Sequence, residues 1–210
     1  MGTKVRTRTL VSLAGVGLLA VQATATVLFD FDNAPNQTPL PVTLTVGGIT
    51  ATFSGTGQGF SIQNANVLGF TPTGFAGRCI YPSSVYGADL IVSFQQTLKD
   101  FSIMYAPEEY ACDSSATLRA TAYLNGAYVG TNTTTAPNPG TWPTGVLDFA
   151  SATPFNSVVV HYDAGPPTGG DWGPVFMADN MYVTAVPEPT SIVGLGFGLV
   201  AAGFLRGKRR

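Results

Sequence analysis

The sequence predicts an all-β protein, an antiparallel β-sandwich of jelly-roll type, followed by one short C-terminal transmembrane helix. Three observations support this fold class. Apolar and polar residues alternate with period two in several short segments between residues 26 and 185. Two of these segments are followed by dipeptides suited to tight hairpins, Gly47-Gly48 and Asn125-Gly126. No segment of this region has the helical periodicity that a crossover between parallel strands requires.

The two hairpins are the most local of these predictions. VTLTV (42–46) and ITATF (49–53) each place apolar residues on one face and threonines on the other, and two glycines join them. TLRATAYL (117–124) alternates in the same way, and AYVGT (127–131) returns after Asn-Gly. Both dipeptides readily adopt the positive φ angles of a turn whose twist matches that of the flanking strands.

Six further segments read as strands, and Gly- and Pro-rich loops such as 135–145 and 163–174 separate several of them. They are 27–31, 90–94, 101–105, 146–150, 157–162 and 175–184. Many short strands between such loops are typical of a sandwich, with a closed β-barrel as the alternative. Together the strands predict one domain over residues 26–185.

The first 25 residues have the three parts of a secretion signal. Lys4, Arg6 and Arg8 form a positive region, residues 10–21 are apolar, and an A-x-A cleavage site ends at Ala25. The apolar part is too short to span a bilayer. We therefore expect export and removal of residues 1–25 by signal peptidase.

The last 25 residues, 186–210, form a second ordered pattern. Pro187, Glu188 and Pro189 precede a short apolar stretch at 192–205 that is rich in glycine. Fourteen helical residues span about 21 Å, against about 30 Å of bilayer hydrocarbon. A basic end follows, which would stay on the cytoplasmic side of the membrane, formed by Arg206, Lys208, Arg209 and Arg210.

This tail resembles the PEP-CTERM sorting signal of exopolysaccharide-producing Gram-negative bacteria, and the resemblance covers only the tail and the leader. It implies recognition by exosortase, a membrane protease, and cleavage near Pro187-Glu188-Pro189. It also implies a precursor tethered to the inner membrane and a product at the cell surface or in the extracellular matrix. An ordinary membrane anchor is the alternative. The same kind of tail also occurs in proteins described as ice-binding.

The predicted domain is acidic. Residues 26–185 hold three basic and eleven acidic side chains, so their net charge is near −8, although the whole chain has a net charge of −2. A surface of this sign repels phosphate backbones, which excludes nucleic acid as a partner.

Two cysteines, Cys79 and Cys112, suggest a disulfide, because an even number of cysteines in an exported chain is typical of one. Two buried thiols are the alternative. Their spacing excludes a metal site of the CxxC type.

Catalytic machinery is not evident, and we expect a protein that is not an enzyme. His161, the one histidine, alternates with apolar residues on a strand and has no partner visible in the sequence. Glu108 and Glu109 adjoin each other in a loop, whereas a glycosidase needs two carboxylates that face each other across a cleft. A glycoside hydrolase is therefore a weak alternative.

Two groups of residues are candidates for ligand binding. Asp30, Asp32 and Asp179 lie on the first and last predicted strands, where their oxygens could meet at a calcium ion. The alternative, which we favour, is that backbone amides satisfy these carboxylates. Trp142 and Trp172 lie in Gly/Pro loops and could stack on sugar rings, or else cover the ends of the core.

The sequence thus predicts an exported, non-enzymatic surface or matrix protein, structural or adhesive within an exopolysaccharide layer. A carbohydrate-binding module with a loop aromatic site is the second hypothesis. Ice binding is a weaker one, because it usually requires regular ranks of threonine and only Thr133-Thr134-Thr135 cluster in the sequence.

Overall fold

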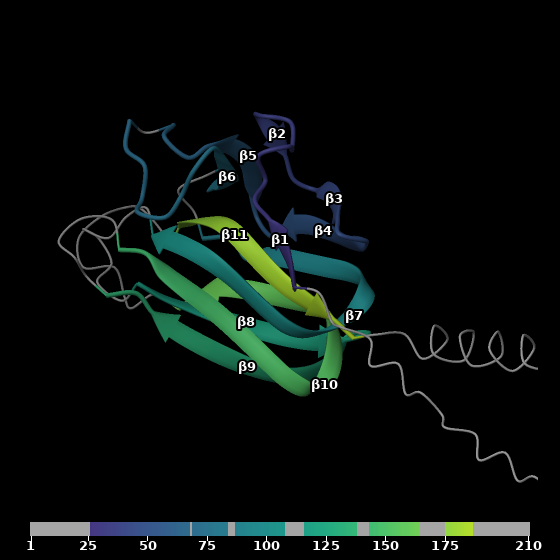
Figure 1. Cartoon of the computed structure of the whole chain (residues 1–210). Coiled ribbons are helices and arrows are strands. Elements are labelled where there is room, and N and C mark those ends of the chain that lie inside the picture. Colours follow the sequence, from purple (N-terminus) through teal and green to yellow (C-terminus); the bar gives the residue numbers. More distant parts are fainter. Residues whose placement is uncertain are drawn as a thin grey trace, which may run out of the picture. The chain divides into compact units, whose positions relative to one another are not determined.

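The computed structural model describes residues 26–67, 69–83, 87–107, 116–137, 143–163 and 175–186, which lie in one compact unit, Thr24–Pro187. These residues form eleven strands, all paired antiparallel, and no helix, so the described part of the chain contains no helix that could cross a membrane (Figure 1). The strands are β1 Thr26–Phe29, β2 Thr38–Pro39, β3 Val42–Val46, β4 Ile49–Gly55, β5 Phe60–Asn64, β6 Arg78–Pro82, β7 Leu90–Pro107, β8 Thr117–Leu124, β9 Ala127–Thr135, β10 Gly145–Tyr162 and β11 Phe176–Ala185.

Both predicted hairpins are confirmed. β3 and β4 pair from Val46↔Ile49 outward, and the φ angles of Gly47 and Gly48 are 55° and 82°. β8 and β9 pair from Leu124↔Ala127 outward, and the turn residues Asn125 and Gly126 have φ angles of 50° and 85°. Positive φ at both central residues is the type I′ geometry that the dipeptides predicted.

The long strands β7 and β10 differ from the sequence prediction, which divided each of them into two. Each runs for 18 residues, because the intervening segments 95–100 and 151–156 stay extended instead of turning. The pairing of β7 with β10 shifts register on either side of Phe155, which marks an irregularity where both strands bend. β5 and β6 were missed by the sequence prediction; they are short and pair with each other.

The two long strands take part in both halves of the sheet. Their Leu90–Phe94 and Ser157–Tyr162 parts pair with β4 and β8, which continue to the outer strands β3 and β9. We call this half the first layer. The other parts of β7 and β10 form the second layer. β7 and β10 pair with each other in both layers. In the second layer β7 also pairs with β11, beyond which lie β6, β5 and β2, and β1 pairs with the C-terminal part of β11.

One apolar core fills the sandwich-like arrangement. Phe53, Val92 and Val158 come from the first layer, and Phe101 and Leu147 from the second, and each is buried in the same cluster. Aromatic rings meet edge to face within it, as in the pair Phe149 and Phe155, whose centroids lie 5.3 Å apart.

Among the described residues, a loop covers one end of the outward face of the second layer. A second, smaller cluster of buried residues lies there beneath the loop between β5 and β6, formed by Ala65, Phe75, Cys79, Ala106 and Met177. The loop approaches so closely that a Cβ atom at Gly74 would lie 2.9 Å from the sulfur of Met104. The rest of this face, toward the ends of β1 and β11, carries the candidate site.

Candidate functional site

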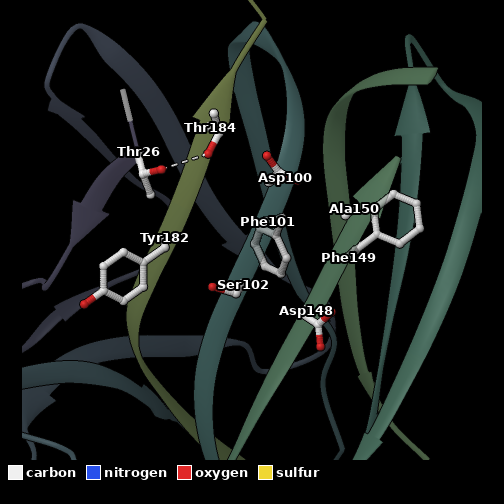
Figure 2. A pocket seen from close by; sticks show the side chains of 9 residues that line it. All are labelled: Thr26, Asp100, Phe101, Ser102, Asp148, Phe149, Ala150, Tyr182 and Thr184. Atoms are coloured by element: carbon white, nitrogen blue, oxygen red, sulfur yellow. Dashed lines mark hydrogen bonds between the residues drawn. The ribbon is translucent and has the colours of Figure 1, made fainter. Parts of the chain in front are cut away.

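An open depression lies on the outward face of the second layer and has a volume of about 370 Å³. It crosses four neighbouring strands, β1, β11, β7 and β10, and Figure 2 shows its side chains. The lining residues are Thr26, Asp100, Phe101, Ser102, Asp148, Phe149, Ala150, Tyr182 and Thr184. Phe101 and Phe149 have side chains buried in the core, so the polar residues and Tyr182 define its chemistry.

Strand register arranges the outward side chains in two rows. One row runs Thr26, Thr184, Asp100, Ala150, and the Thr26 and Thr184 hydroxyl oxygens lie 3.1 Å apart. The next row runs through Tyr182, Ser102 and Asp148. Neighbouring strands are about 4.8 Å apart, so each row offers groups at regular short steps across the sheet.

Tyr182 faces outward because of a β-bulge in β11. Asp179 pairs with Met104 and Tyr182 with Ser102, so β11 uses three positions where β7 uses two. Asn180 absorbs the extra residue with a φ angle of 48°, a left-handed conformation that asparagine tolerates better than most residues. The ring of Tyr182 is 45% exposed as a result, a large aromatic surface on a sheet face.

The same bulge corrects the sequence prediction for β11. Strict period-two alternation over the predicted strand 175–184 would place Asp179 on one face with Met177, Met181 and Val183. In the structure Met181 and Val183 belong to the main core, whereas Met177 lies in the smaller outward cluster. Strict alternation fails here because one inserted residue reverses the facing of everything after it.

Two carboxylates flank the centre of the depression. Asp148 lies opposite Ser102 on the neighbouring strand, and Asp100 lies one row away, diagonal to Asp148. Among the described residues, Asp100 has one cationic neighbour, Lys99, whose Nζ is 4.0 Å from Asp100 Oδ2, and both side chains are nearly half exposed. An exposed pair of that length contributes little. The described lining residues therefore hold two acids and no base.

Asp179 lies beneath the covering loop and is 1% exposed. Its carboxylate accepts hydrogen bonds from the backbone amides of Asn180 at 2.7 Å and Ala76 at 3.3 Å. Burial raises the pKa of Asp179 from 3.8 to about 7; the two hydrogen bonds lower it, and the charges of Asp32 and Asp30 raise it further. The carboxylate thus fixes the loop at Ala76.

The predicted calcium ligands are occupied by such contacts. Asp32 Oδ1 accepts the Arg78 backbone amide at 2.7 Å, and Asp30 Oδ1 accepts the amide of Asp32 at 3.2 Å. Within the described ranges no three His, Cys, Asp or Glu side chains are placed to hold a metal ion. All three carboxylates thus accept backbone hydrogen bonds, and the calcium site and its alternative stay predictions.

His161 lies on the outward face of the first layer, the polar face predicted for it, and it has partners that the sequence did not reveal. Its Nδ1 lies 2.6 Å from Asp89 Oδ1, and its Nε2 lies 3.7 Å from Asp163 Oδ1. Arg119 Nη2 lies 3.0 Å from the same Asp163 oxygen. Each ring nitrogen faces a carboxylate, whereas in a catalytic triad one of the two ring nitrogens faces the nucleophile.

Several predicted site residues lie outside the described residues. They are Glu108, Glu109, Cys112, Trp142 and Trp172, together with the whole leader and the tail residues Pro187, Glu188, Pro189, Arg206, Lys208, Arg209 and Arg210. Cys79 is buried in the smaller cluster. The Cys79–Cys112 disulfide and the loop tryptophan site therefore stay predictions.

The sequence analysis did not single out Tyr182, Asp100, Ser102 or Asp148. They lie within strands rather than in Gly/Pro loops, and only strand pairing brings them together. The one local signal is the Asp-Asn pair at 179–180, since both residues favour turns and tolerate left-handed backbone.

No protein-family model and no curated protein matches the chain. Solved structures match weakly. The K2 cleaved adhesin domain of Lys-gingipain matches with a TM-score of 0.47 and 13% identity, over 76% of this chain and 99% of that one. A family 29 carbohydrate-binding module matches with a TM-score of 0.36 and 9% identity, over 81% and 98%. The Agl-KA catalytic domain matches with a TM-score of 0.39 and 14% identity, over 72% and 29%. Similarities at this level say nothing about the site.

Proposed function

We propose that residues 26–185 are a non-enzymatic carbohydrate-binding module of the jelly-roll-like sandwich class, and that the depression around Tyr182 holds a polysaccharide chain. The exposed ring of Tyr182, in one row with the polar side chains of Ser102 and Asp148, carries the proposal. A sugar ring stacks on an aromatic face through its apolar C–H groups, while its hydroxyls need hydrogen-bonding partners at the edge.

The shape of the site also suits a chain rather than a small molecule. The depression is open and crosses four strands, so a bound polymer could continue beyond it at both ends. Its hydroxyl and carboxylate groups come from four strands and repeat in two rows, as Figure 2 shows. An enclosed, mostly apolar pocket would instead be expected for a small ligand.

Affinity electrophoresis tests this function with the full-length chain purified in mild detergent. Gels containing soluble neutral, amino or acidic polysaccharides should retard the wild type in at least one case, and Tyr182→Ala should abolish that retardation. Tyr128→Ala is the matched control. Tyr128 lies on β9 in the first layer, away from the depression, and is 64% exposed; its ring packs edge to face with that of Tyr123 on β8. Retardation that survives Tyr182→Ala, or that is lost in Tyr128→Ala, would place binding elsewhere. Release of shorter oligosaccharides would contradict the non-enzymatic part.

The proposal includes an address for the module. The leader and the Pro187-Glu188-Pro189 tail support export, a temporary inner-membrane tether and release by exosortase to the cell surface or matrix. A module that binds polysaccharide would meet its ligand in the exopolysaccharide at the cell surface or in the matrix. The site and the tail therefore both support an adhesive role there.

A further inference from the structure

We propose that the depression selects polysaccharides with protonated amino groups, such as partly deacetylated polymers of N-acetylglucosamine. This inference rests on the proposed function and names its substrate class. Asp100 and Asp148 would bind the ammonium group of an amino sugar, beside a ring stacked on Tyr182.

The placement of the two carboxylates is the first argument. Asp148 lies opposite Ser102 and Asp100 opposite Ala150, so the two acids are diagonal neighbours on one face. Diagonal positions in an antiparallel pair lie about 7–8 Å apart at Cα. An ammonium group seated over Ser102 could reach both carboxylates at charge-assisted hydrogen-bond distances of about 2.8 Å.

The free state of these carboxylates is the second argument. Among the described residues, the Asp100 carboxylate has one contact, the 4.0 Å approach of Lys99. At Asp148 the backbone carbonyl, and not the carboxylate, accepts the Asn132 side-chain amide at 2.8 Å. By contrast, Asp30, Asp32 and Asp179 hold backbone amides. Like charges near each other on a sheet are unfavourable, and a cation between them removes that cost.

Charge also excludes the opposite class of polymer. The described lining has two acids and no base, and residues 26–185 carry a net charge near −8. Polyuronates and sulfated polysaccharides would be repelled by the domain as a whole and by the site in particular. A cationic polymer is attracted at long range, held by two carboxylates at short range, and in contact with an aromatic face that itself favours cations.

Isothermal titration of the full-length chain in mild detergent tests the selection. The probes are hexamers of glucosamine, N-acetylglucosamine and galacturonate, each measured in low and high salt. We expect wild type to bind the glucosamine hexamer about tenfold more tightly than the acetylated one, with a preference that shrinks in high salt. The galacturonate hexamer should bind least.

Matched variants separate the site from the overall charge. The double variant Asp100→Asn with Asp148→Asn should reduce the preference for the glucosamine hexamer over the acetylated one from about tenfold to less than about twofold. Asp89→Asn with Asp163→Asn removes the same charge from the other layer and should retain it. Equal binding of both hexamers by wild type, a preference that survives the first double variant, or one lost in the second, would overturn the inference.

The same titrations distinguish failure of this inference from failure of the proposed function. Tyr182→Ala should weaken binding of every hexamer that the wild type binds, charged or not. If wild type binds neutral and amino hexamers equally and Tyr182→Ala binds neither, the function stands and the selection is wrong. If wild type binds no hexamer but is retarded in a gel, the selection is wrong and the function stands. If Tyr182→Ala binds as wild type does, or wild type neither binds a hexamer nor is retarded in any gel, the proposed function itself is wrong.

Discussion

Asp179 and Tyr182 lie on the same outward face of β11, although an unbroken strand would place residues three positions apart on opposite faces. One extra residue between them, held by the left-handed backbone of Asn180, brings both outward. Asp179 then fastens the covering loop at Ala76, while Tyr182 stands in the open part of the face. The bulge thus separates the closed and open ends of this surface.

The backbone at Asn180 should tolerate glycine but not a β-branched residue. Asn180→Val forces a branched side chain into the left-handed region, and we expect it to lower the free energy of unfolding by about 2 kcal/mol or more. Asn180→Gly keeps the conformation and loses only the 3.1 Å hydrogen bond from Asn180 Nδ2 to the Gly74 carbonyl, so it should cost about 1 kcal/mol. Urea unfolding compares them, and equal losses would contradict a conformational origin.

Asp179 should make the domain less stable as the pH rises from about 4 to about 7. The folded-state pKa is raised to about 7 from an ordinary 3.8, so the folded protein holds this proton more tightly than the unfolded chain does. The favourable contribution is complete below about pH 4 and is lost as the pH rises through 7. Its size is on the order of 2–4 kcal/mol.

Asp179→Asn is the test of this titration. The variant lacks the titrating group, so its unfolding free energy minus that of wild type should rise between pH 4 and pH 8 and level off above it. Taking the difference cancels the groups that both proteins share. Chemical unfolding at a series of pH values gives the two curves, and parallel curves would show that Asp179 is ionised throughout.

Gly77 should resist substitution for a reason beyond its backbone angle. Its φ is +55°, and a Cβ atom there would overlap the Asp32 carboxylate that accepts the Arg78 amide. Gly126 has a φ of +85° but open space around it, so Gly126→Ala measures the conformational cost alone, about 1–2 kcal/mol. Gly77→Ala should cost about 1–3 kcal/mol more, because Asp32 must move. Equal shifts of the unfolding midpoint would show that Asp32 moves aside freely.

The tail should be removed during export. A 14-residue apolar segment falls short of the roughly 20 residues that span a bilayer, so it tethers the precursor only weakly, and the basic end opposes full export. If exosortase reads this motif, as we propose, Glu188→Ala or Pro189→Ala should trap the tethered form. Intact mass of the surface protein decides the matter. Material that still contains residues 190–210 would identify a plain anchor.

Local chemistry predicted the hairpins, and long-range pairing explains most of what the sequence did not reveal. Gly47-Gly48 and Asn125-Gly126 specify their turns within two residues. Nothing local shows that the polar stretch at 95–100 stays extended, because its partners are in β10 and β11. The carboxylate partner of His161 could not be predicted for the same reason, since Asp89 lies 72 positions away in the chain.

The depression was hidden from sequence for a different physical reason. A strict period-two reading of β11 puts Asp179 and Tyr182 on opposite faces, and only the bulge at Asn180 brings both onto the outward face. Asp100 and Asp148 are 48 positions apart and meet only through the pairing of β7 with β10. From sequence alone, aromatic residues in Gly/Pro loops are interpreted as candidate binding residues, whereas aromatic residues within strands are interpreted as part of the core.

The continuity of β7 and β10 has a mechanical consequence. Each strand runs without a break from the layer that carries the depression into the layer behind it. A pull on Ser102 or Asp148, such as the proposed polysaccharide would exert, therefore passes along covalent backbone into the opposite layer, where β4 and β8 hold the same two strands by ladders of hydrogen bonds. Both layers therefore bear the load together. Separating them would require distorting the backbone of β7 and β10, and not only disrupting the side-chain packing between the layers.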